Sequence, residues 1–406
     1  MKLNTHLALV VVLMAALISG WCNGPAPPKP PSTPTPSSNA PPRPRVPNGK
    51  EVTFYPTYGY RVGTSWNAQL RGWVHEDREL EAKGAARLLK RMANCNAAQM
   101  KTVEARSADI TDDDKEVETV KVKFVSDPDG KEYEFSKTKF EGIFTLDLAL
   151  TDEKATQLQK LEHSSNGWLT YRAVSNDYPG LGRVRLIEPN GVSVISDIDD
   201  TIKITEVPAG QATVLRNTFC LDFRAVTEPG ILAKYNLGGD IPVHYVSGGP
   251  EQLFGPLYDF LIINPGGFPE GTFHLKYFPK DLSILRSVFS SLDVTYDHKL
   301  KTITTLMDRF PDRKFILVGD SGEVDPEVYN EIKKNDRRGQ VTEIVIRDVI
   351  NDNVVNPWRL AGMTPIPVDP PICIEQKHFE QLSKRVEKFH PERPKPYIRN
   401  PACGKG

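Results

Sequence analysis

Residues 191–203 read GVSVISDIDDTIK, an apolar run that ends in two aspartates separated by one residue. Further apolar runs are IPVHYVSG (241–248), KFILVGD (314–320) and VTEIVIRDV (341–349), and helical patterns lie between them at 252–261 and 298–310. Short buried strands that alternate with helices indicate a parallel sheet covered on both faces. The sequence therefore predicts an α/β fold for this part of the chain, with ligands bound beyond the carboxyl ends of the strands.

Acidic side chains at the ends of these runs suit a divalent cation. Asp197 and Asp199 follow the first run, and two carboxylates so close repel each other unless a cation or a proton balances their charge. Asp320 ends the run at 314–320, and Asp325 lies just after it. Hard cations prefer several oxygen ligands, so we expect Mg²⁺ bound by Asp197, Asp199, Asp320 and Asp325. Strand-end turns or helix caps are the other interpretation of such aspartates.

Three more residues suit a phosphate group beside that cation. Ser247 ends the second run and is followed by two glycines, whose amides can bind an anionic oxygen. Lys299, in the segment DHKLKTI, would neutralise a phosphate from the other side. Thr201 would fix the loop that carries Asp197. We therefore expect Thr201, Ser247 and Lys299 to form the phosphate-binding part of one site.

The ordered set of motifs resembles the haloacid dehalogenase superfamily of phosphohydrolases, with its Asp-x-Asp-x-Thr, strand-end Ser or Thr, Lys, and Gly-Asp followed by an acidic residue. The segments SDIDDTIK, YVSGGPEQL, HKLKTI and GDSGEVDPEVY are further similar to the catalytic domain of the actin-patch-associated phosphatidate phosphatases. The resemblance covers roughly residues 190–351. It implies a Rossmann-like, haloacid dehalogenase-like parallel sheet and Mg²⁺-dependent hydrolysis of phosphatidate, or a related lipid phosphomonoester, to diacylglycerol.

The same resemblance implies how the two strand-end aspartates act. Asp197 would be the nucleophile that forms an aspartyl-phosphate, and Asp199 would protonate the leaving oxygen and later activate water. This acid role calls for a raised pKa of Asp199, which we expect from its crowded carboxylate surroundings. Asp199 would also contact the metal through its backbone carbonyl. We expect Asp200 to point away from the site and to cap the next turn.

Two other functions remain open from the sequence. A phosphatase of the same superfamily could act on a soluble phosphomonoester, because the motifs bind the phosphate while flanking loops select the rest of the substrate. A non-catalytic surface binding protein would use the phosphatase fold only as a scaffold. Degenerate enzymes usually lose a nucleophile or a metal ligand, and both are present here.

The N-terminus predicts export. Lys2 precedes an apolar run at 7–18 and small residues, which is the layout of a signal peptide, assigned here to residues 1–22. The run is too short for the roughly 20 residues that span a bilayer. Residues 23–48 are rich in proline and predict a semi-rigid linker. We therefore expect a secreted or periplasmic protein without a transmembrane helix after cleavage.

The rest of the chain divides into three predicted parts. Residues 49–185 contain alternating and β-branched runs and predict a mainly β, sandwich-like domain with one helix at Asp77–Met92. Residues 186–352 form the predicted catalytic domain. Residues 353–406 form a C-terminal extension with one helix, whose apolar face carries Phe379, Leu382, Val386 and Phe389. This face predicts packing against the α/β domain or, as the alternative, peripheral contact with a membrane.

Charge and cysteine content exclude some partners. The formal net charge of -1 provides no general attraction for a nucleic acid, so we expect none. Four cysteines remain after the signal peptide and permit three pairings, of which Cys373 with Cys403 would clip the C-terminal tail. The sequence has no Cys-x-x-Cys pair of the kind that binds zinc.

Overall fold

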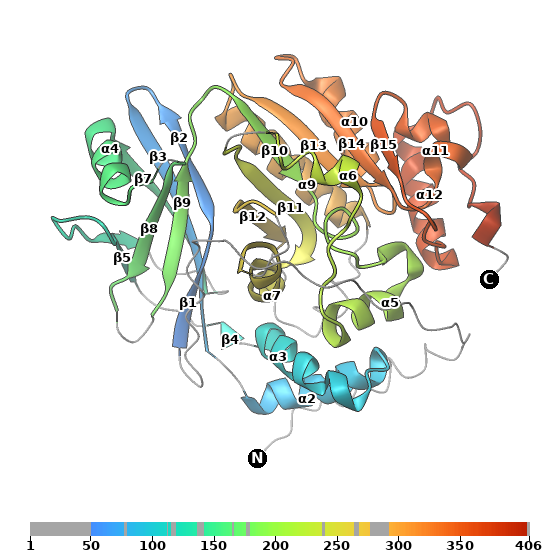
Figure 1. The fold of residues 1–406 in the computed structure, drawn as a ribbon, viewed down its shortest axis with the longest axis horizontal. Coiled ribbons are helices and arrows are strands. Elements are labelled where there is room, and N and C mark those ends of the chain that lie inside the picture. The colour runs from blue at the N-terminus through green and yellow to red at the C-terminus, as the bar shows by residue number, and fades with distance from the viewer. Residues whose placement is uncertain are drawn as a thin grey trace.

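The structure is a computed structural model. It describes residues 50–76, 79–111, 113–114, 119–135, 142–164, 166–175, 179–237, 240–263, 268–276 and 292–403. The predicted signal peptide and proline-rich linker lie outside the described residues. Two sheets organise the molecule, one mainly antiparallel and one parallel (Figure 1).

The parallel sheet consists of six strands in the order β12-β11-β10-β13-β14-β15. Their bounds are β10 (Val192–Ser196), β11 (Val243–Pro250), β12 (Thr272–Lys276), β13 (Lys314–Asp320), β14 (Val341–Asp348) and β15 (Thr364–Pro367). Every pair of neighbouring strands in it is parallel. The predicted parallel sheet is therefore confirmed, and its carboxyl ends all point to one edge. The predicted C-terminal extension also supplies β15.

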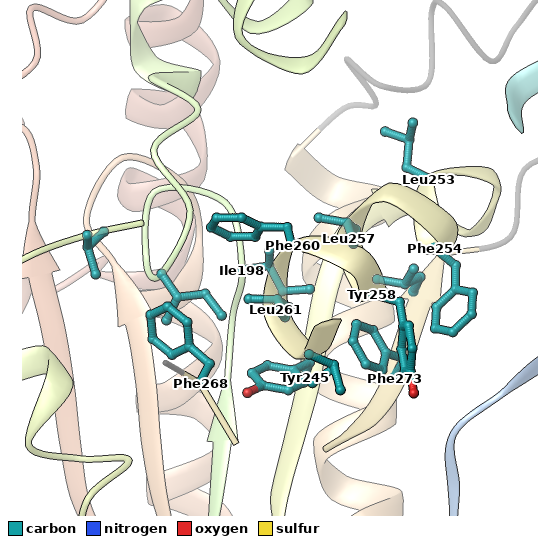
Figure 2. Packing of buried hydrophobic residues seen from close by; sticks show 14 of the residues in the cluster. Ile198, Tyr245, Leu253, Phe254, Leu257, Tyr258, Phe260, Leu261, Phe268 and Phe273 are labelled. Atoms are coloured by element: carbon teal, nitrogen blue, oxygen red, sulfur yellow. The ribbon is translucent and has the colours of Figure 1, made fainter. Parts of the chain in front are cut away.

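Helices cover both faces of this sheet because successive side chains of each strand point to opposite faces and are apolar on both. Val194, Ile316 and Val345 belong to one core, and Ile195, Leu317 and Ile346 belong to the other. The first core is covered by α5 (Gln211–Leu215), η3 (Arg216–Cys220), α6 (Pro229–Leu232), α7 (Phe254–Tyr258) and η5 (Asp259–Ile263). The second is covered by α9 (Leu292–Arg309), α10 (Asp325–Asn335) and α12 (Gln376–Phe389). Figure 2 shows α7 and η5 side chains packed near Tyr245 and Phe273 of the sheet.

The mainly β domain is built on one curled sheet of nine strands. Their bounds are β1 (Lys50–Tyr55), β2 (Thr57–Val62), β3 (Ser65–Glu76), β4 (Asp113–Asp114), β5 (Val120–Phe124), β6 (Tyr133–Phe135), β7 (Ile143–Thr151), β8 (Trp168–Ala173) and β9 (Leu181–Leu186). The long strand β3 pairs with β1, β2, β4 and β7, and among the described strands of this sheet only β2 and β9 pair in parallel. The sheet encloses a core of its own, which includes Phe54, Trp66 and Tyr171. The described strands thus form one sheet, where the sequence predicted a sandwich-like pair.

A helical hairpin inserted between β3 and β4 leaves the curled sheet and packs on the α/β domain. It consists of α2 (Glu79–Met92), η1 (Ala97–Gln99) and α3 (Met100–Thr111). Leu89 and Val103 lie in the same core as Phe219 of η3. In Figure 1 the hairpin lies beneath α5 and α7. The sequence predicted the first helix but not α3. Arg106, Ser107 and Asp109 lie on the buried side of α3, so this helix lacks the apolar periodicity by which a helix is predicted.

The C-terminal helix packs against the α/β domain, as the sequence predicted. Leu382 and Val386 are buried, and Phe389 stacks on Tyr296 of α9 with ring centroids 4.4 Å apart. The apolar face that a membrane would need is thus covered by the protein itself. Cys373 is bonded to Cys403, which confirms the predicted clip, and the other pair is Cys95 with Cys220. Within the described ranges, no helix is both long and apolar enough to cross a bilayer.

Candidate active site

The carboxyl edge of the parallel sheet brings most of the predicted site residues together. Asp197 directly follows β10, Ser247 lies in β11, and Asp320 ends β13. Lys299 lies on α9, and Asp325 is the first residue of α10. These five side chains are all at most 1% exposed, although they come from segments far apart in the sequence.

The loop after β10 is held in a tight turn. The amide of Asp197 donates to the carbonyl of Val318 on β13 at 2.9 Å, which fixes the start of the loop to the neighbouring strand. Thr201 Oγ1 donates to Asp197 Oδ2 at 3.0 Å, so the predicted role of Thr201 in fixing the Asp197 loop agrees with its geometry. Asp200 adopts a left-handed backbone conformation with φ of 56°. Its carboxylate accepts hydrogen bonds from the amides of residues 205, 206 and 207, which confirms that it caps the next turn.

Three buried carboxylates meet at the centre of the site. Oxygen atoms of Asp197, Asp320 and Asp325 all lie within 4.8 Å of one another. Burial raises the pKa of Asp197 and of Asp320 well above the ordinary value, and the neighbouring Asp325 adds to both shifts. Oδ2 of Asp320 is buried and accepts no hydrogen bond from the described residues. A hard divalent cation fits this group, because it would bind such oxygens and cancel their repulsion.

One lysine supplies positive charge to the carboxylates. Lys299 Nζ lies 2.8 Å from Asp197 Oδ1 and 2.5 Å from Asp325 Oδ1. Burial lowers the pKa of Lys299, but the two carboxylates outweigh this and raise it well above the ordinary value. The single positive charge of Lys299 does not balance three carboxylates, so the site retains the capacity for a cation.

Asp199 lies outside this carboxylate group. Its Oδ1 lies 2.6 Å from Lys203 Nζ and accepts a hydrogen bond of 2.6 Å from Thr205 Oγ1. Burial raises the pKa of Asp199, but Lys203 and Thr205 outweigh it, so the net shift is downward. The expectation of a raised pKa was therefore wrong, because the nearest charge to Asp199 is a lysine and not another carboxylate. Asp199 is ionised in the free protein.

A cleft opens from this edge of the sheet to solvent. Its volume is about 1060 Å³, including the open mouth. Asp199, Lys203 and Glu323 lie on its polar side, and the amide of Gly249 donates to Ser247 Oγ at 2.9 Å near its floor. Apolar residues also line it: Val207, Val214, Phe223, Leu253, Leu257 and Leu292. Further polar residues line it too, among them Thr218, Thr295, Glu375, Lys377 and His378. The cleft therefore offers both charged and apolar surface.

The sequence reasoning did not single out Lys203, Thr205 or Glu323. Lys203 follows Asp199 by four residues within the same motif, and this spacing is the signal that was available for an ion pair. Glu323 lies between Asp320 and Asp325 in the sequence. Burial raises its pKa to about 7, with Lys299 opposing the shift. These three residues reach the site through contacts made only on folding, so spacing alone did not reveal them.

Three histidines near the site are held in structural contacts. His244 Nδ1 lies 2.8 Å from Thr272 Oγ1, and His274 Nε2 lies 2.9 Å from the same hydroxyl. His298, next to Lys299, has its Nε2 3.1 Å from the carbonyl oxygen of His274. Burial lowers the pKa of all three rings, to about 3 for His274 and about 4 for His298. They are therefore neutral, hydrogen-bonded parts of the interior.

Buried carboxylates and a lysine meet at the carboxyl edge of the parallel sheet, beside an open cleft, in an arrangement typical of an enzyme site. Residues 192–348 match the family described as "Phosphatidate phosphatase APP1, catalytic domain". This matched segment includes all seven predicted site residues and is similar to the catalytic domain of a phosphatase family.

Two yeast proteins are similar to part of this chain. One, "Phosphatidate phosphatase APP1" of Saccharomyces cerevisiae, is 35% identical over 147 residues, which cover 35% of this chain and 24% of that protein. The other, "Uncharacterized protein C29B5.04c" of Schizosaccharomyces pombe, is 29% identical over 174 residues, which cover 42% of this chain and 27% of that protein. The similarity thus spans about a quarter of each relative.

Proposed function

We propose that this protein is a Mg²⁺-dependent phosphatase that converts phosphatidate, or a related lipid phosphomonoester, to diacylglycerol through an aspartyl-phosphate. The meeting of Asp197, Asp320 and Asp325 beside Lys299 carries this proposal. Asp197, Asp320 and Asp325 would hold Mg²⁺, with Asp199 adding its backbone carbonyl. When bound, Mg²⁺ would share the negative charge of the phosphoryl group. The implied fold is haloacid dehalogenase-like.

The side chains suit the two steps of such a reaction, formation of the aspartyl-phosphate and its hydrolysis. Asp197 attacks phosphorus, the bond from phosphorus to the glycerol oxygen breaks, and Asp199 gives a proton to that oxygen. Asp199 then takes a proton from the water that hydrolyses the aspartyl-phosphate. Ser247 and Lys299 bind the non-transferring oxygens, and Thr201 orients Asp197. Since Asp199 is ionised beside Lys203, its acid role depends on the negative charge of the bound phosphoryl group, which favours its protonation.

The shape of the cleft supports a substrate with an apolar part. Phosphate groups would lie at the charged end near Asp197, and the wall with Phe223, Leu253 and Leu257 is apolar. Burial of apolar surface against such a wall contributes about 25 cal/mol for each Å². This wall is the specific reason to favour a lipid phosphomonoester over a soluble ester. The apolar run at residues 7–18 after Lys2 is the basis for proposing a signal peptide at residues 1–22, a linker at residues 23–48, and export to the periplasm or the exterior.

Phosphate release from dioleoyl phosphatidate in detergent micelles tests the function. The wild-type protein should release phosphate with Mg²⁺ and stop with EDTA, and Asp197→Asn should lose at least about 10³-fold in rate. Asp312→Asn, at an exposed position before β13, is the matched control and should retain full rate. Phosphate bound to the protein during turnover should be labile to hydroxylamine, as expected for an acyl phosphate.

Three results would lead to other conclusions. A marked preference for soluble esters over phosphatidate would remove the lipid assignment and favour the soluble-phosphomonoester alternative. No Mg²⁺-dependent release from any ester would favour a non-catalytic binding protein. Equal rates for Asp197→Asn and the wild type would reject Asp197 as the nucleophile.

A further inference from the structure

Helix α3, outside the family-matched segment, reaches the cleft wall through Arg106. The Arg106 side chain is 9% exposed, and its Nη1 donates to the carbonyl oxygens of Thr218 at 2.5 Å and Leu221 at 2.6 Å. Its guanidinium carbon also lies 3.9 Å from the centroid of the Phe223 ring. One side chain of the N-terminal region thus contacts the segment 218–223 at three points.

That segment forms part of the active-site cleft. Thr218 and Phe223 both line it. Lys203 Nζ lies 4.8 Å from the Phe223 ring centroid, and the same ammonium pairs with Asp199. Phe260 packs edge-to-face against Phe223 with centroids 5.6 Å apart. Phe223 is therefore in contact with Arg106, with the core beneath the cleft and with the loop that carries the proposed acid.

The chemistry of the contact explains why an arginine occupies this position. The last carbonyl groups of a helix have no partner within the helix, and cations near that end are favoured. Thr218 lies in η3, which ends at Cys220, and Leu221 follows it directly. A planar guanidinium can donate to such carbonyls at its edge while its flat face stacks on a ring, whereas an ammonium has no flat face to stack. Arg106 therefore contacts both the backbone and the Phe223 ring of this segment.

A covalent bond joins the same two regions. Cys95 precedes α3, and Cys220 ends η3, so their disulfide attaches the hairpin beside the Arg106 contact. Asn217 Nδ2 donates to the carbonyl of Thr205 at 2.8 Å, which links η3 to the loop with Lys203. The disulfide holds the hairpin near η3, while Arg106 sets how the chain after η3 faces the cleft.

We propose that Arg106 is a positioning residue for the cleft wall: it fixes the segment 218–223 and Phe223, and so sets the shape of the cleft for the part of the substrate beyond the phosphate. This inference rests on the proposed phosphatase function. The N-terminal region would then contribute to substrate selection although it lies outside the catalytic-domain family. A small ester that fills only the charged end does not reach this wall.

Steady-state kinetics of Arg106→Met on two substrates test the inference. With dioleoyl phosphatidate in micelles, KM should rise about tenfold, because misplacement of binding groups weakens contacts to the apolar part. With glycerol 3-phosphate, which has no apolar part, kcat and KM should stay within about twofold, because contacts to the phosphate are unchanged. For phosphatidate, the KM of Arg106→Lys should lie between those of the wild type and Arg106→Met. Lys101→Met, at an exposed position on the same helix, should have the wild-type KM. Equal loss on both substrates, or no loss on either, would overturn the inference.

Hydrogen exchange of the full chain provides a second readout. Amides of residues 218–224 should exchange faster in Arg106→Met, while those of β10 and β13 should not change. If the wild type hydrolyses neither ester, the proposed function fails, and the exchange result alone decides whether Arg106 fixes the wall. If Arg106→Met does not fold, Phe223→Leu should reproduce the rise in KM for phosphatidate only. Unchanged exchange in a folded variant would contradict the positioning role.

Discussion

Lys299 Nζ lies within 2.8 Å of Asp197 and also contacts Asp325, so one ammonium bridges a residue at the end of β10 and the first residue of α10. These groups are almost fully buried. An ion pair in such a place is costly to break, because the partner left behind keeps its charge without compensation. The geometry therefore links the stability of the protein to the groups proposed for catalysis.

Lys299→Met should destabilise the protein and abolish most activity. We expect the free energy of unfolding in EDTA to fall by about 3–5 kcal/mol, because Asp197 and Asp325 lose their counter-charge. Excess Mg²⁺ should recover part of this loss, since the cation would occupy the same carboxylates. Urea unfolding with EDTA and with Mg²⁺ measures both effects. The same loss in both conditions would contradict a metal site between these residues.

Mg²⁺ itself should stabilise the wild-type protein. At a concentration about 100 times Kd, binding to the folded state alone adds about 2.7 kcal/mol to the free energy of unfolding. Asp320→Asn should lose this gain and keep or raise the stability measured in EDTA, because one of three repelling carboxylates is removed. Thermal unfolding with and without Mg²⁺ compares the two proteins. A full Mg²⁺ gain in Asp320→Asn would show that the cation binds elsewhere.

Glu327 should give the protein a stability that depends on acid pH. Arg359 Nε and Nη2 donate to its two carboxylate oxygens at 2.8 Å each. Burial raises the pKa of Glu327, but Arg359 outweighs this and lowers it from 4.5 to about 2. The stabilisation is therefore fully present above about pH 4.5 and is lost as the pH falls toward 2.

Glu327→Gln tests this directly. It should cost about 3 kcal/mol near neutral pH, since it removes one of the two buried carboxylates, Glu327 and Asp352, that pair with Arg359. The difference from the wild type should shrink as the pH is lowered from 5 to about 3. Glu392→Gln, at an exposed position, should match the wild type throughout. A difference that stays constant over this pH range would contradict the lowered pKa.

The two disulfides should contribute unequally to the free energy of unfolding. Cys95 and Cys220 are 125 residues apart, and Cys373 and Cys403 are 30 apart. A longer closed loop removes more conformational entropy from the unfolded chain, and the difference here corresponds to roughly 1 kcal/mol. We expect the Cys95→Ser/Cys220→Ser pair to unfold at lower urea concentration than the Cys373→Ser/Cys403→Ser pair. The reverse order would show that native contacts outweigh the entropy term.

Several features of the site were predictable because they depend on local pattern. The apolar runs define the strands, and residues directly after parallel strands must meet at one edge. Asp197, Ser247 and Asp320 were predicted in this way, whereas Lys299 and Asp325 were predicted from their place in the order of motifs. Asp200 was also placed correctly, since short polar side chains after a strand readily cap the following turn.

Other features depend on contacts that no local pattern contains. The pKa of Asp199 is lowered because Lys203 turns back toward it, and the opposite direction was expected from the neighbouring carboxylates. The sequence assigned the helix at Asp77–Met92 to the β-rich domain and did not predict α3, but apolar residues of both α2 and α3 pack in the core of the parallel sheet. The curled sheet likewise depends on β3 pairing with strands on both sides.

The order of apolar runs and polar ends along the chain thus determined the parallel sheet and the identity of its edge residues, because both follow from side-chain periodicity within a few neighbours. Tertiary structure alone decided which charges face each other and which distant helix supports the cleft wall. Arg106 and Phe223 are separated by more than a hundred residues and touch only after the hairpin packs. Such contacts arise from the packing of whole elements, so their chemistry is visible only in the folded chain.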